Sequence, residues 1–77
     1  MNKLELKIEM ARNGDTQASL ADAMGIPASA LNNRINGKTD FRKNEINFIR
    51  GRYHLSANRT MEIFFDEIVS ESDTISA

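Results

Sequence analysis

Apolar residues recur at helical spacing along most of the 77-residue chain. In the first segment Leu4, Ile8 and Ala11 stand at i, i+4 and i+7, and Gly14 ends the run. This spacing predicts a helix over about residues 3–12 with these residues on its buried face. No stretch alternates apolar and polar residues for long, so the pattern predicts an all-α fold.

A second helix is predicted to begin after Asp15 or Thr16, because either side chain is a good N-cap. Its expected buried face consists of Leu20, Ala21 and Met24. Gly25 follows, and glycine accepts the positive φ of a tight turn without steric cost.

The turn leads into a third helix, because Pro27 is suited to the first positions of a helix. We expect this helix to run to about Ile35 and to end at Asn36 and Gly37. Two helices of about eight residues, joined by a turn of three or four, predict a helix-turn-helix over about residues 16–36.

Two further helices are predicted in the second half of the chain. The fourth carries apolar residues at helical spacing, namely Ile46, Ile49 and Tyr53. Ser56 is the expected cap of the fifth, whose apolar positions are Met61, Phe64, Phe65 and Ile68. We therefore predict one compact five-helix domain over residues 1–69, followed by a flexible tail at 70–77.

The composition excludes several classes of protein. A chain of 77 residues holds one small domain, and the absence of cysteine excludes disulfides and cysteine-based zinc sites. His54 has no Cys or His partner, so we interpret it as a surface or packing residue and expect no metal, cofactor or small-molecule ligand. No apolar run is long enough for a membrane span, and the first residues lack a signal-peptide centre. These features favour a cytoplasmic protein.

Charge is distributed unevenly although the whole chain carries only −1. Residues 26–54 sum to +4, whereas residues 55–77 sum to −4. A basic middle segment indicates an anionic partner for that part of the chain.

The third helix has a polar face of unusual composition. At about 100° per residue, Leu31 and Ile35 fall together, with Ala28 beside them on the expected buried side. The opposite arc holds short uncharged polar residues: Ser29, Asn32, Asn33 and Asn36. Asparagine is a poor helix former, and its amide can pair with the N6/N7 edge of adenine in the major groove.

We expect DNA base contacts from four residues of this helix: Ala28, Ser29, Asn32 and Asn33. The alternative is that Asn32 and Asn33 merely tolerate solvent, and the nearby basic residues favour base contact over it. Asn36 is chiefly the expected C-cap.

Phosphate contacts are expected from the residues that flank this face: Gln17, Arg34, Asn36, Lys38, Thr39, Arg42 and Lys43. The alternative is an ordinary solvated charged loop. The position of this loop directly after the third helix favours phosphate contact over that alternative. We interpret Arg50 and Arg52 as residues that solubilise the fourth helix.

Several motifs together resemble a known family. Gln17-x-x-Leu20-Ala21-x-x-x-Gly25-Ile26, Ser29-x-Leu31 and Asn36-Gly37-Lys38 are similar to the pattern of phage Cro and repressor proteins, the Xre-type helix-turn-helix family. Residues 35–46 and the Ile63-Phe64-Phe65 run resemble a subgroup of small regulators from phages of Gram-positive bacteria.

The resemblance implies a lambda-repressor-like fold, binding to double-stranded operator DNA, a bacterial host cell and often homodimers on palindromic sites. It implies the same base readers, and phosphate contacts at Gln17, Asn36, Lys38 and the following loop. Pro27 departs from the usual Ser or Thr helix cap, and Asn33 stands where the subgroup often has a basic residue.

The leading hypothesis is a sequence-specific DNA-binding transcriptional regulator. The alternative is a phage modulator or antirepressor that binds a partner repressor through its acidic C-terminal half. Ile63, Phe64 and Phe65 are consecutive, so we expect part of this run to be exposed as a protein interface. We read Asp66, Glu67 and Glu71 as a solvated acidic face. An enzyme is not expected, because no acid–base pair or nucleophile is visible.

Overall fold

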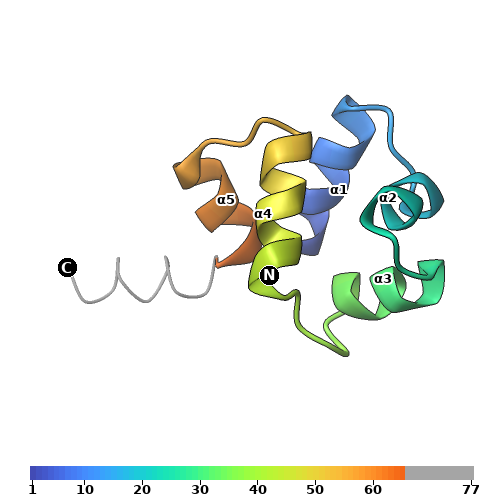
Figure 1. Ribbon diagram of the computed structural model, residues 1–77. Helices are drawn as coiled ribbons and strands as arrows, with labels where there is room; N and C mark the ends of the chain where they lie inside the picture. Colours follow the sequence, from blue (N-terminus) through green and yellow to red (C-terminus); the bar gives the residue numbers. More distant parts are fainter. Residues whose placement is uncertain (66–77) are drawn as a thin grey trace.

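The computed structural model describes residues 1–65, which form five helices and no strand (Figure 1). The helices are α1 (Lys3–Arg12), α2 (Gln17–Met24), α3 (Ala28–Ile35), α4 (Lys43–Arg52) and α5 (Ala57–Phe64). The prediction of a compact all-α chain is confirmed, and α1, α2 and α3 have the expected bounds. The predictions for Ile68, Val69, the acidic face at 66–71 and the tail at 70–77 lie outside the described residues.

Local side-chain hydrogen bonds explain where the helices begin. Thr16 and Ser19 cap α2 reciprocally. The Thr16 backbone N–H donates to the Ser19 hydroxyl at 2.9 Å, and the Ser19 backbone N–H donates to the Thr16 hydroxyl at 3.1 Å. Ser56 accepts from the Arg59 N–H at 3.0 Å, as predicted for α5. Gly25 ends α2 with a φ of 74°, a left-handed conformation that favours glycine.

The buried face of α1 is not the one that the spacing of Leu4 and Ile8 predicts. Leu4 is 67% exposed and Ile8 is 37% exposed, whereas Leu6 and Met10 are buried. Ala11 is exposed as well, so the predicted face is wrong although the predicted helix is right. Glu9 shares the buried face with Leu6 and Met10, and Arg59 on α5 compensates its charge.

The core lies where side chains from all five helices meet. Its fully enclosed side chains are Leu6, Leu20, Leu31, Ile35, Ile49 and Ile63. Phe64 is buried, and its ring meets that of Phe41 edge to face at a centroid distance of 5.3 Å. The expectation of a protein interface on Ile63 and Phe64 is therefore wrong, and Phe65 is half-buried against the same core. The loop before α4 supplies Phe41, which lets the core accept three consecutive apolar residues.

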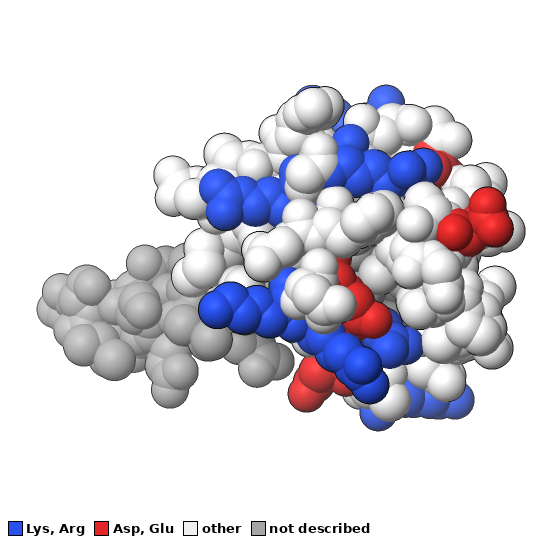
Figure 2. Space-filling view, viewed as in Figure 1, with Lys and Arg blue, Asp and Glu red and all other residues white. Residues whose placement is uncertain are grey.

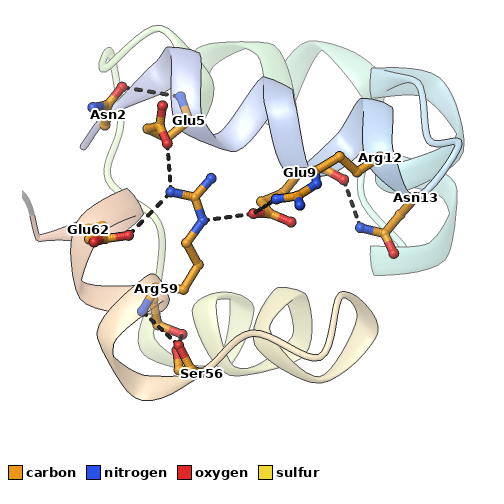
Figure 3. A network of polar contacts seen from close by, with 9 residues as sticks. Asn2, Glu5, Glu9, Arg12, Asn13, Ser56, Arg59 and Glu62 are labelled. Atoms are coloured by element: carbon orange, nitrogen blue, oxygen red, sulfur yellow. Dashed lines mark hydrogen bonds and ion pairs between the residues drawn. The ribbon is translucent and has the colours of Figure 1, made fainter.

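Arg59 joins α5 to α1 through a partly buried ion-pair network (Figure 3). Its Nε donates to Glu9 Oε2 at 2.7 Å, and its Nη1 donates to Glu5 Oε1 at 2.6 Å. Glu9 is 6% exposed, so the guanidinium compensates a carboxylate that burial would otherwise destabilise. Beside this network the Asn2 backbone N–H donates to the Ile63 carbonyl at 2.6 Å, which also holds α1 against α5.

Asp15 ties the turn between α1 and α2 to the end of α4. It accepts two hydrogen bonds from Arg52, at 2.7 and 3.0 Å, and one from the Tyr53 hydroxyl at 2.7 Å. The hydrogen bond from Arg52 holds the pKa of Asp15 far below its usual value, against the opposing effect of burial. Burial and the bond to Asp15 raise the pKa of the Tyr53 phenol. Arg52 is thus a structural residue, and its interpretation as a solubilising charge is wrong.

Candidate nucleic-acid interface

The polar face of α3 points away from the core. Leu31 and Ile35 are buried, whereas Ser29 and Asn32 are exposed and Asn33 is half-buried. Ala28 is exposed at the first turn, which corrects its expected place on the buried side. Pro27 is the N-cap of the helix, with φ −63° and ψ 149° and no side-chain cap hydrogen bond.

Asn36 is the C-cap of α3 and holds the side chain of Asn32. Its Nδ2 donates to the Asn32 backbone carbonyl at 2.9 Å and to Asn32 Oδ1 at 3.0 Å. By contrast, the amide of Asn33 makes no hydrogen bond with any residue in the described part of the chain. The two asparagines thus differ: one is held in place and the other can turn.

The loop after α3 folds back onto the end of the helix. Gly37 adopts a φ of 80°, and the Asn33 carbonyl then accepts from the Lys38 N–H at 2.9 Å and from the Thr39 N–H at 3.4 Å. This places Lys38 and Thr39 beside the polar face of α3, and both are exposed. These two predicted phosphate contacts are therefore next to the predicted base readers.

Arg34 does not point toward the polar face, which contradicts its prediction as a phosphate contact. Its Nε donates to Glu45 Oε1 at 2.9 Å and its Nη1 donates to the Ala30 carbonyl at 3.1 Å, with 14% of the side chain exposed. Burial by itself would raise the pKa of Glu45, but the Arg42 backbone N–H and the Arg34 guanidinium outweigh it and lower that pKa. Arg34 therefore fastens α3 to α4.

The other predicted phosphate contacts occupy different places. Arg42 is exposed at the start of α4, and Gln17 is half-buried at the start of α2. Lys43 lines an opening of about 510 Å³ between α4 and α5, together with Ile46 and Met61. Lys43 is therefore on the side of α4 that borders α5 and is not gathered with the α3 face.

Lys3 belongs to the candidate interface although the sequence pattern did not indicate it. Its Nζ donates to Asn36 Oδ1 at 2.6 Å, across 33 residues of chain. The contact joins the first residue of α1 to the C-cap of α3, so no local signal in the sequence could have found it.

The surface charge is mixed rather than uniformly basic. In Figure 2, Lys and Arg side chains lie over α4 and the loop that leads into it, several of them beside Asp or Glu, whereas the surface over α2 is mainly uncharged and acidic. Residues 1–65 nevertheless sum to +3, because four of the acidic residues lie at 66–77. The described residues are thus more basic than the whole chain.

Comparison of the chain with protein-family models, curated proteins and solved structures finds no match. None of the helices within residues 1–65 combines the length and apolar character that a membrane crossing needs. Within the same residues, no group of three His, Cys, Asp or Glu side chains is arranged to hold a metal ion. The function is therefore inferred from the geometry of α3 and the residues around it.

Proposed function

We propose that this chain is a sequence-specific DNA-binding regulator that inserts α3 into the major groove. One observation carries the proposal: the exposed face of α3 consists of short uncharged polar residues, while the opposite face is fixed in the core by Leu31 and Ile35. A solvated helix face without a binding role would favour Glu, Lys and Gln, which are better helix formers.

The dimensions of α3 suit this task. An α-helix with its side chains is about 10–12 Å across, which matches the width of the major groove, about 12 Å. α3 packs against α2 across a short turn, which supports the proposal of a helix-turn-helix in which the second helix reads bases. Asn33 has a free amide for the bidentate pairing with adenine, Ser29 can donate or accept, and Ala28 can contact a thymine methyl.

Exposed basic residues near α3 would contact the phosphates. Lys38 lies in the loop that follows the helix, and Arg42 lies at the start of α4. Gln17 and Ala18 contribute N–H groups that have no partner within α2, because they belong to its first turn. This small set of cations predicts a moderate salt dependence of binding.

Selection from a random pool of double-stranded DNA at low and moderate salt tests the proposal. We expect one reproducible motif, and a palindromic motif would indicate that two copies bind together. Salt-sensitive binding without any motif would contradict sequence-specific recognition and favour the alternative of a regulator that binds a partner repressor.

Asn33→Ala then tests the role of α3, and Asn58→Ala on α5 is the matched control. We expect Asn33→Ala to cost about 1–3 kcal/mol on the selected site and little on scrambled DNA. Asn58 is exposed on another helix, so its substitution should leave both affinities unchanged. Full discrimination between the two DNAs in a folded Asn33→Ala protein would contradict the assignment of α3 as the reading helix.

A further inference from the structure

Three polar side chains from α1 and α3 form a continuous relay that ends at a predicted base reader. Lys3 Nζ donates to Asn36 Oδ1 at 2.6 Å, and Asn36 Nδ2 donates to Asn32 Oδ1 at 3.0 Å. The same Asn36 Nδ2 also donates to the Asn32 backbone carbonyl at 2.9 Å. Each amide in the relay therefore has a definite orientation.

The lysine decides this orientation because an ammonium group can only donate hydrogen bonds. Asn36 must present its oxygen to Lys3, and its NH2 group is then directed at Asn32. Asn32 in turn presents its oxygen to Asn36. The Asn32 NH2 group is left as the part of the amide that has no partner among the described residues.

We infer that Lys3 sets the base specificity of Asn32 by holding it as a hydrogen-bond donor. This inference rests on the proposed function, because it assumes that α3 reads base edges. In the major groove a donor matches an acceptor edge, and guanine offers two acceptors, O6 and N7. Asn32 should therefore prefer guanine, whereas the free amide of Asn33 can pair with adenine through both its groups.

Lys3 is a positioning residue, since it acts on the base through Asn36 and Asn32. Lys3→Met removes the donor and keeps most of the aliphatic chain, and Lys3→Arg restores a donor. Lys7→Met is the matched control, because Lys7 is exposed on the same helix and its loss removes the same charge. Asn32→Ala identifies the base position that Asn32 reads.

The first measurement uses the free full-length protein and no DNA. We expect Lys3→Met to shift the side-chain amide NMR signals of Asn36 and Asn32, while Lys3→Arg and Lys7→Met leave them close to wild type. Unchanged Asn36 and Asn32 signals in Lys3→Met would overturn the relay, whatever the protein does with DNA.

The second measurement compares the four bases at the position that Asn32 reads in the selected site. We expect guanine to be preferred, and Lys3→Met to lose about five- to tenfold of that preference at this position alone. Lys3→Arg should restore the preference and Lys7→Met should keep it.

The outcomes separate the inference from the proposed function. Full preference in Lys3→Met, or a preference for a base other than guanine at this position, overturns the inference while DNA recognition stands. A selection that yields no motif overturns both.

Discussion

Cationic side chains have different roles in two regions of the molecule. In one region, Arg52 makes two hydrogen bonds to Asp15, and Arg59 binds Glu9; both carboxylates are almost fully enclosed. Around the C-terminal end of α3, Lys38 and Arg42 are exposed and make no ion pair with any residue from 1 to 65. The first set stabilises the fold, and the second set is available to a ligand.

This difference shows that a run of basic residues does not measure the charge available for binding. Arg34 belongs by sequence to the basic middle segment, yet its ion pair with Glu45 places it in the structural set. Cations that compensate buried carboxylates control stability, whereas exposed cations control affinity and its salt dependence. The following predictions test this division.

The largest effect is expected from Arg59→Ala. It leaves Glu9, with a side chain that is 8% exposed, without its compensating charge, so we expect a loss of about 3–5 kcal/mol in the free energy of unfolding. Arg12→Ala is the control, because the Arg12 side chain is 68% exposed and its pair with Glu9 is longer, at 3.4 Å. Denaturant unfolding of both variants measures the difference, and equal stabilities would remove Arg59 from the structural set.

Arg34→Ala tests the residue that was predicted as a phosphate contact but pairs with Glu45 in the structure. It removes a charge-assisted hydrogen bond to Glu45, and we expect a loss of about 1.5–3 kcal/mol in stability. On DNA, the slope of log affinity against log salt should stay at the wild-type value. A slope that becomes shallower by about one unit would return Arg34 to the phosphate contacts.

Acid should destabilise the protein through the same carboxylates. The pKa of Asp15 and that of Glu45 lie below their ordinary values of 3.8 and 4.5, so both groups bind protons more readily in the unfolded chain. Their contribution is therefore complete above about pH 5 and is lost as the pH falls through the lowered folded-state values. Urea unfolding between pH 7 and 2 measures this loss.

Asp15→Asn should remove part of the acid dependence, because the Arg52 contact no longer involves a carboxylate. Asp22→Asn provides the control, since Asp22 is exposed on α2. An identical acid dependence in Asp15→Asn and wild type would show that the Asp15 contacts do not contribute.

The smallest effect on folding is expected from Lys38→Ala. Stability should change by less than about 0.5 kcal/mol, because Lys38 is exposed and its side chain is unpaired within the described residues. Binding to every DNA should weaken by a similar factor, and the salt slope should become shallower by about one unit. Affinities at four salt concentrations measure the slope, and an unchanged slope would exclude a phosphate contact.

Local signals in the sequence were sufficient to place most helix ends. Thr16, Ser56 and the Asn36-Gly37 pair act within a few residues of the ends that they define, so their effect can be read directly from the chain. The sequence also predicted that Leu31 is buried and that Asn32 is on the opposite, exposed face of α3, because helix geometry fixes which residues share a side.

Contacts between distant parts of the chain account for the errors. The first helix has two apolar stripes, and the buried one also carries Glu9, which Arg59 binds across 50 residues. The Arg34 side chain is directed at Glu45, and the Lys3 side chain is directed at Asn36, by hydrogen bonds between residues far apart in the sequence. Helical periodicity contains no information about these long-range pairs. It predicted which residues of α3 share the polar face, but not that Lys3 contacts Asn36 beside that face.

The hydrogen bond between the Asn2 N–H and the Ile63 carbonyl has a consequence for how the chain can be reconnected. Since it brings the beginning of α1 next to the end of α5, a short linker could join these two points without disturbing the core. New ends could then be opened between α4 and α5 at His54, which is exposed between the buried Tyr53 and Leu55. Such a circular permutant would begin with α5 and end with α4, and it would keep α2 and α3 uninterrupted. A folded permutant of this kind would show that the fold depends on which helices touch and not on their order along the chain.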